Sequence, residues 1–173
     1  SLGARCLLAN LGELRAQADL AEFTIQQSAA EIADAIAARA PKILGLGVYI
    51  WNAARAAELL PLLRHKLPQL KIVLGGPETL QVSSSSERGH LGRSECGQDV
   101  RAPDQNQPLT RSLLSSSDFL LPGEGDLAFA ALCRDLLSSP HSRPFASICG
   151  SLRPPPPDLA AIQLPYAEYT DAD

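Results

Sequence analysis

The chain has 173 residues, of which 45% are hydrophobic and 20% charged, and this ordinary composition excludes a wholly disordered chain. Fifteen Lys and Arg against 19 Asp and Glu give a net charge of −4, which argues against nucleic-acid binding because that needs a basic surface. No apolar run approaches the roughly 18 residues that a membrane span needs, so we expect none. The four cysteines form no CxxC or CxxxCxxC pattern and no export signal is present, so a cytoplasmic protein with reduced thiols is expected.

The first forty residues predict two helices and a strand between them. Leucines at helical spacing predict an amphipathic helix over 2–18, and alternating β-forming residues predict a short strand over 22–26. Ser28 and Glu31 have the spacing of a capping box, which predicts the start of a second helix. Pro41 is expected to end that helix.

The remainder of the recognisable elements alternates between strands and helices. The uninterrupted apolar run 43–50 predicts a central parallel strand covered on both faces. A helix over 53–66 and strands over 71–74 and 118–121 follow, and leucines over 127–136 predict a closing helix. This alternation predicts an α/β fold with an open, mostly parallel sheet and helices on both faces.

Composition divides the chain into one domain and a connector. We expect an α/β domain over 1–152 that contains a mobile, Ser-rich insertion over 83–108, because that stretch has few large apolar side chains. Four consecutive prolines at 154–157 predict that residues 153–173 form a stiff linker.

Three loops that follow predicted strands carry the candidate site. They contain Trp51 and Asn52, then the run 75–78 (GGPE), then the run 123–125 (GEG). Ligands of open parallel sheets bind outside the carboxyl ends of the strands, and glycine lets a ligand approach the backbone. Each loop also has a purely structural interpretation, as a turn, as a strand-to-helix connection or, for Trp51, as a packing residue. The residues themselves leave both interpretations open.

No catalytic machinery is evident in the sequence. His65 lies on a polar helix face, and His90 and His141 lie in loop segments, so no Ser-His-Asp or Cys-His arrangement can be argued. No carboxylate pair stands out as a general acid and base. From the residues alone, the chain is a binding domain without catalytic residues or metal ligands.

Three sequence blocks in a fixed order carry a family resemblance: GLGVYIWN at 45–52, IVLGGPE at 72–78 and GEGDLAF at 123–129. Together they resemble the N-terminal cobalamin-binding domain of cobalamin-dependent radical S-adenosylmethionine enzymes. That group includes magnesium-protoporphyrin monomethyl ester oxidative cyclases and Fe–S oxidoreductases. The closing run LPYAEY at 164–169 is similar to the linker that precedes the family's radical domain.

The resemblance implies a flavodoxin-like, Rossmann-like domain that binds cobalamin and is not catalytic alone. The corrin would lie across the strand ends, with its nucleotide tail inserted between the sheet and a helix. The full-length enzyme would transfer methyl groups or perform related radical chemistry. Its 4Fe-4S cluster and S-adenosylmethionine would bind only in the absent radical domain. The alternative is a flavodoxin-like nucleotide- or partner-binding domain without cobalamin. The residues that the resemblance assigns to cofactor binding are Tyr49, Trp51, Asn52, Gly75, Gly76, Pro77, Glu78, Gly123, Glu124 and Gly125.

Two features depart from the family pattern. The family's first strand would precede the helix at 2–18 and lie between the strands at 22–26 and 43–50, but the chain offers no residues for it. We therefore expect a truncated piece, or another segment that fills the gap. The Asp-x-His-x-x-Gly motif that supplies a cobalt ligand in methionine-synthase-like domains is also absent.

Overall fold

The computed structural model describes most of the folded elements and a short piece near the C-terminus. The predicted insertion lies almost wholly outside the described residues, as do the predicted domain boundary at 152 and most of the predicted linker. The described residues are 1–79, 107–121, 123, 125–138 and 161–164. Their elements are α1 (Leu2–Ala9), the 3-10 helix η1 (Gly12–Gln17), α2 (Ala29–Arg39), β1 (Ile43–Gly47), α3 (Ala53–Lys66), β2 (Lys71–Gly75), α5 (Gln107–Ser116), β3 (Phe119–Leu121) and α6 (Asp126–Ser138).

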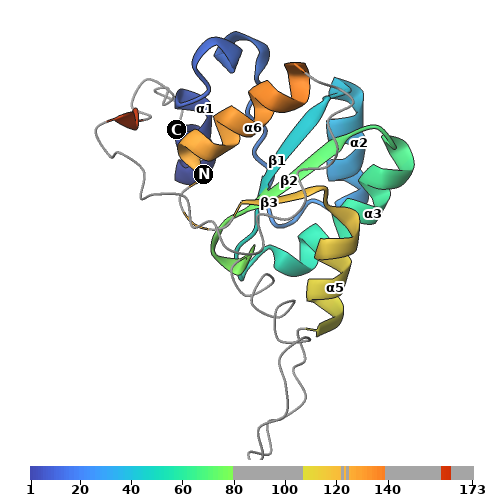
Figure 1. Cartoon of the computed structure of the whole chain (residues 1–173). Coiled ribbons are helices and arrows are strands. Elements are labelled where there is room, and N and C mark those ends of the chain that lie inside the picture. The colour runs from blue at the N-terminus through green and yellow to red at the C-terminus, as the bar shows by residue number, and fades with distance from the viewer. Residues whose placement is uncertain (80–106, 122, 124, 139–160, 165–173) are drawn as a thin grey trace, which may run out of the picture.

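The described sheet has three parallel strands in the order β1-β2-β3. Gly47 pairs with Gly75 and Gly75 pairs with Leu121, so the carboxyl ends of all three strands lie side by side. The sheet is open, and helices alternate with its strands along the chain (Figure 1). The predicted fold class, an α/β flavodoxin-like open parallel sheet, is confirmed.

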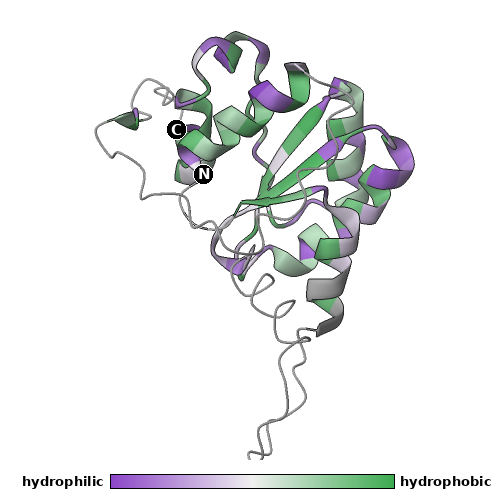
Figure 2. Ribbon diagram, viewed as in Figure 1, coloured by the Kyte–Doolittle hydropathy of each residue, from purple (hydrophilic) through white to green (hydrophobic). Residues whose placement is uncertain are grey.

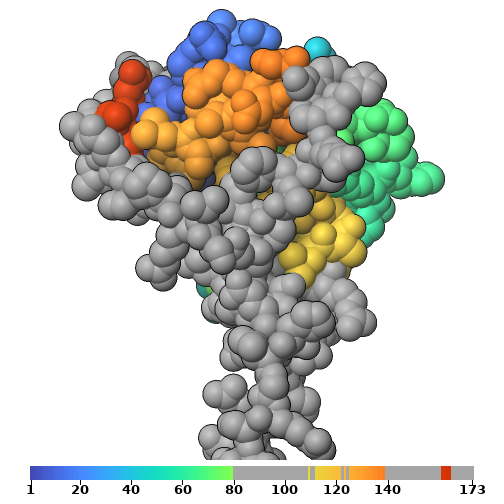
Figure 3. Space-filling model, viewed as in Figure 1, coloured from blue at the N-terminus to red at the C-terminus, as the bar shows by residue number. Residues whose placement is uncertain are grey.

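Helices cover both faces of the sheet (Figure 1). Helix α3 contacts both α2 and α5 on one face, and α1 contacts α6 on the other. Figure 3 shows α6 beside α1 and η1 on the nearer face of the molecule. Side chains of β2 alternate between these layers: Ile72 and Leu74 belong to the core under α3, whereas Val73 packs toward Phe129 of α6.

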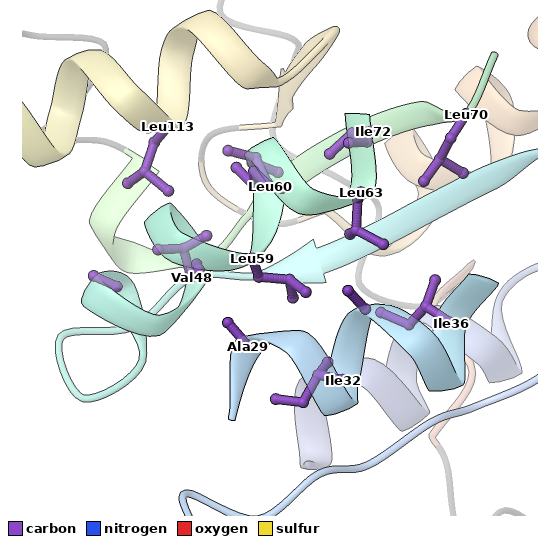
Figure 4. Close-up of a cluster of buried hydrophobic side chains, with 14 residues drawn as sticks. Ala29, Ile32, Ile36, Val48, Leu59, Leu60, Leu63, Leu70, Ile72 and Leu113 are labelled. Atoms are coloured by element: carbon purple, nitrogen blue, oxygen red, sulfur yellow. The ribbon is translucent and has the colours of Figure 1, made fainter. Parts of the chain in front are cut away.

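The largest core lies between the sheet and helices α2, α3 and α5. Figure 4 shows side chains from these elements converging on Leu60 and Leu63 of α3, which are completely buried. Figure 2 shows the corresponding pattern, with apolar strands inside and polar residues on the outer helix surfaces. Burying a leucine side chain contributes about 2 kcal/mol, so this face provides most of the driving force for folding.

Local signals set the bounds of α2 as predicted. The Ser28 hydroxyl accepts the Glu31 N–H at 3.2 Å, and the Glu31 carboxylate accepts the Ser28 N–H at 2.8 Å, which confirms the capping box. Helix α2 ends at Arg39. Its C-cap residue Ala40 has a left-handed φ of 45° and directly precedes Pro41.

Helix α3 continues through a proline. Pro61 lies inside the helix and lacks an N–H, so the Ala57 carbonyl four residues earlier loses its usual helical partner. The Ser112 hydroxyl of α5 donates to that carbonyl over 3.4 Å. A neighbouring helix thus supplies the hydrogen bond that the proline removes.

Three predicted elements differ in the structure. Residues 22–26 form no strand; Thr24 and Gln27 hydrogen-bond to each other in a turn instead. The predicted helix over 2–18 is divided into α1 and η1 by Asn10 and Leu11. The apolar run that begins at 43 forms only the five residues of β1.

The position of β1 also differs from the prediction. Among the described residues β1 is bonded to β2 alone, so β1 lies at an edge of the sheet and β2 is the central strand. Gly45 and Gly47 of β1 are exposed, whereas Ile72, Val73 and Leu74 of β2 are buried. The described residues contain no strand beside β1 on the side away from β2. Whether a further segment takes that place, as the resemblance implies, stays a prediction.

Within the described residues, none of the helices has both the length and the apolar character required to cross a lipid bilayer.

Candidate functional site

The parallel register gathers the three predicted loops at the carboxyl edge of the sheet. Loop 48–52 follows β1, loop 76–79 follows β2, and Gly123 and Gly125 follow β3. The first two loops are in direct contact. The Val48 N–H donates to Gly75 O at 2.7 Å, and the Glu78 N–H donates to Val48 O at 3.4 Å. We call this edge the carboxyl rim.

A stacked aromatic pair, with Tyr49 half-buried and Trp51 exposed, lies in the first loop. The rings of Tyr49 and Trp51 stack with their centroids 4.7 Å apart and their planes 8° from parallel. Trp51 is 71% exposed and Ile50 78% exposed, so the loop presents unpartnered apolar surface to solvent. The structure contradicts a packing role for Trp51 in the core and leaves its ring accessible to a ligand.

Asn52 organises this loop from within. Its Oδ1 accepts the Tyr49 N–H at 2.8 Å, and its Nδ2 donates to Gly47 O at 2.9 Å. The side chain therefore closes the turn that raises the aromatic pair. Asn52 is a positioning residue for Tyr49 and Trp51 in this structure, which its sequence assignment did not specify.

Gly76 is required by the backbone of the second loop. Its φ of +99° lies in the left-handed region, and a Cβ added there would lie 2.5 Å from Val48 O. The buried Thr79 supports the same turn, because its hydroxyl donates to Gly76 O at 2.6 Å. The space beside Gly76 is thus filled by the chain itself, and the structural interpretation of this glycine holds.

The other residues of the second loop leave more room. A Cβ at Gly75 would lie 3.7 Å from Leu121 O, an ordinary van der Waals contact. Pro77 is exposed and begins a helical turn, where its missing N–H is no loss, and Glu78 is half-buried beside it. These residues border the rim without blocking it.

The third loop supplies an open backbone surface. Gly123 has a φ of +81°, and no atom of the described residues lies within 4 Å of the position of an added Cβ. A Cβ added at Gly125 would lie 3.7 Å from the Cδ2 atom of Leu7 in α1. Glu124 lies outside the described residues, so its predicted role stays a prediction.

The sheet face beneath α6 is closed next to β1. The Phe129 ring covers Gly45 so closely that an added Cβ would lie 2.7 Å from its Cζ atom. This side chain occupies the space between β1 and α6. The resemblance places a nucleotide tail between the sheet and a helix, and a tail under α6 would meet this ring next to β1. A ligand of the carboxyl rim would therefore lie across the strand ends beside Phe129.

The described residues hold neither a metal-ligand cluster nor an activated thiol. They contain no group of three His, Cys, Asp or Glu side chains that could hold a metal ion. Burial raises the pKa of the Cys6 thiol, and the Asp126 carboxylate adds to this effect. Burial likewise raises the pKa of Cys133 to about 11. Both thiols stay protonated at neutral pH, so neither is an activated nucleophile.

Sequence reasoning missed three residues of the rim. Val48 serves through its backbone, Thr79 through a buried hydroxyl, and Gly3 of α1 through its closeness to the Tyr49 hydroxyl, 2.9 Å from an added Cβ. The sequence predicted the helix that contains Gly3 but not its contact with Tyr49. Contacts between distant segments leave no local pattern.

A shallow hollow lies at the opposite edge of the sheet. It has a volume of about 300 Å³ and is lined by residues 41–42 and 66–70, which precede β1 and β2. The strands begin at this edge, so the hollow is separate from the carboxyl rim.

Comparisons with protein-family models, with curated proteins and with solved structures found no match to this chain. The fold and the geometry of the rim therefore carry the functional argument.

Proposed function

We propose that this chain is a cobalamin-binding domain whose flat macrocycle lies across the carboxyl rim. The observation that carries the proposal is the stacked pair of half-buried Tyr49 and exposed Trp51 at the carboxyl end of a parallel sheet. Ligands of open α/β sheets bind at this edge. A solvent-exposed aromatic surface of this kind suits a flat, conjugated ring, because burying it removes apolar area from water.

The glycines of the rim support a ligand that lies against the backbone. With respect to the described residues, Gly123 has open space where a side chain would be, and Gly75 has only an ordinary contact there. Gly76 contributes by shaping the turn. Cobalamin carries its cobalt within the corrin, so the lack of a metal-ligand cluster among the described residues is compatible with the fit.

The chain's own residues would bind and orient the group. Asn52 holds the loop, Tyr49 and Trp51 offer the flat surface, and Phe129 limits how deeply a ligand can reach under α6. Bound cobalamin would supply a cobalt centre that can carry a methyl group. The resemblance adds the further proposals that a radical S-adenosylmethionine domain of the same protein uses that centre and that the protein works in the cytoplasm.

The test uses Trp51, the single tryptophan of the chain, as a reporter. Hydroxocobalamin is titrated into the 173-residue chain while tryptophan fluorescence is recorded, and the mixture is then passed through a gel-filtration column. We expect saturable quenching and a red chromophore that elutes with the protein. A protein peak free of corrin absorbance at saturating concentration would contradict the proposal.

Matched variants locate the binding surface. Trp51→Ala and Tyr49→Ala should each weaken corrin binding about fivefold and so lower the corrin retained on gel filtration, since each loses an aromatic contact of roughly 1 kcal/mol. Leu137→Ala is the control, because Leu137 is exposed on α6 away from the rim. An equal loss in all three variants would argue against the rim as the site.

The same fluorescence assay examines the alternative function. The exposed ring of Trp51 could also stack on the base or ring of a nucleotide. Quenching by flavin mononucleotide or ATP, with no corrin retained, would favour a nucleotide-binding domain of flavodoxin-like fold.

A further inference from the structure

Asn10 joins two segments of the chain that are 153 residues apart. Its Nδ2 donates to Gln163 O at 2.9 Å, and its Oδ1 accepts the Gln163 N–H at 2.8 Å. Asn10 itself follows α1 directly and is only 9% exposed. We propose that Asn10 docks the C-terminal segment 161–164 onto helix α1 as a releasable strap.

The pairing uses only the backbone of Gln163. A side-chain amide has the same donor and acceptor as a peptide group, so Asn10 takes the place of a neighbouring β-strand residue. The Gln163 side chain takes no part in these two bonds. The dock therefore depends on the identity of residue 10 and on the N–H of residue 163, and it tolerates different side chains at 163.

The end of α1 holds the Asn10 side chain in its docking orientation. The Asn10 Nδ2 also donates to Cys6 O at 2.8 Å, and the Asn10 backbone N–H lies within 3.2 Å of the carbonyls of Cys6 and Leu7. These carbonyls belong to the last turn of the helix, and the Cys6 carbonyl accepts from both the backbone and the side chain of Asn10. Binding of the strap therefore costs little side-chain conformational entropy at Asn10, because that side chain is already fixed by its bond to Cys6 O.

The strap buries little apolar surface. Ile162 is half-buried, while Ala161 and Gln163 are exposed and Leu164 is 66% exposed. Among the described contacts of segment 161–164, the two neutral hydrogen bonds with Gln163 are therefore the main stabilising interactions. Together they favour the docked state on the order of ten- to a hundredfold. An equilibrium of that size can be reversed by a competing contact without unfolding the sheet.

Helix α1 connects this dock with the carboxyl rim. The position of a Cβ on Gly3, at the start of α1, is 2.9 Å from the Tyr49 hydroxyl, and Asn10 follows the end of the same helix. Eight helical residues separate the two ends by about 12 Å. The strap is therefore held on the helix that borders the rim, although the proposal does not depend on what the rim binds.

Amide exchange of Gln163, measured by NMR on the 173-residue chain, tests the dock. Asn10→Ala removes both bonds and should speed exchange of the Gln163 N–H about tenfold or more. Asn10→Asp keeps an acceptor for that N–H but sets a carboxylate against Gln163 O, so it should weaken the dock as well. Gln163→Ala is the control and should leave the exchange at position 163 slow.

Two readouts separate the dock from folding. The amides of Ile72 and Leu74, in the central strand, should exchange at unchanged rates in every variant. Gln163→Pro, which removes the donor without touching α1, should raise the fast backbone motion of Ile162 and Leu164 in heteronuclear NOE measurements. Unchanged Gln163 exchange in Asn10→Ala, or a Gln163→Ala variant as disruptive as Asn10→Ala, would overturn the proposal.

Discussion

Gly76 shows how a single residue joins two loops of the carboxyl rim. Its φ of +99° belongs to a region that L-residues other than glycine rarely adopt. The Val48 carbonyl lies where its side chain would begin. Gly123 has a positive φ as well, but open space beside it. The two glycines therefore separate the cost of backbone conformation from the cost of a close contact.

We predict that Gly76→Ala destabilises the domain more than Gly123→Ala. The conformational cost of alanine at a left-handed position is about 1–2 kcal/mol, and this should be the whole effect at Gly123. At Gly76 the clash with Val48 O should raise the loss to about 3 kcal/mol. Urea unfolding followed by circular dichroism measures both. Equal losses would show that the loop relaxes away from Val48.

At the scale of elements, the start of α2 combines a helix cap with a titratable group. Glu31 accepts hydrogen bonds from both the N–H and the hydroxyl of Ser28. These bonds lower the pKa of the Glu31 carboxyl, the backbone bond having the larger effect. Because the folded-state pKa lies below that of the unfolded chain, the ionised cap stabilises the fold above the unfolded value. The contribution is lost as the pH falls through the lowered folded pKa.

We predict that Glu31→Gln removes this pH dependence. Glutamine can still cap the helix but does not titrate. The variant should be less stable than the wild type at pH 7 and should approach it in stability at pH 3. Urea midpoints measured between pH 3 and pH 7 give the comparison. A gap of constant size across that range would contradict the assignment.

Helix α3 gives a second prediction at this scale. Pro61 leaves the Ala57 carbonyl to the Ser112 hydroxyl of α5. In the wild type, Ser112→Ala should cost about 0.5–1 kcal/mol, because it leaves that carbonyl without a protein partner. In a Pro61→Ala background the helix satisfies the carbonyl itself, so the same substitution should cost little. A double-mutant cycle by urea unfolding measures the coupling, and additive effects would show that the bond contributes nothing.

At the scale of the whole molecule, Arg64 joins elements at the edge where β2 and β3 begin. Its guanidinium donates to Ser116 O and Leu70 O and pairs with the Asp118 carboxylate. That carboxylate also accepts the Ile72 N–H at 2.7 Å. One side chain of α3 thus holds the end of α5 against the starts of two strands.

We predict that Arg64→Met lowers the free energy of unfolding by about 2 kcal/mol, because it leaves the part-buried Asp118 without its cation. Arg55→Met is the matched control. Arg55 pairs with Glu58 over 3.2 Å on the surface of the same helix, and such exposed pairs contribute at most about 0.5 kcal/mol. Equal effects of the two substitutions would contradict the role assigned to Arg64.

Predictions from the sequence succeeded where short-range patterns decide the outcome. The capping box at Ser28, the helix over 53–66 and the order of strands and helices followed from spacing of a few residues. The strand expected at 22–26 failed because alternation in a short segment cannot show whether a partner strand exists. Among the described residues β1 likewise lies at an edge and not at the centre of the sheet, since an apolar run reports hydrophobicity and not neighbouring strands.

The sequence by itself determined the α/β alternation, and with it the loops that meet at one edge, because parallel strands joined by helices must all end there. Only the tertiary structure decided what each rim residue does. It turned Asn52 inward to hold its own loop, gave the space beside Gly76 to Val48, and left Trp51 exposed. Those roles depend on contacts between segments far apart in the chain, and no local pattern encodes such contacts.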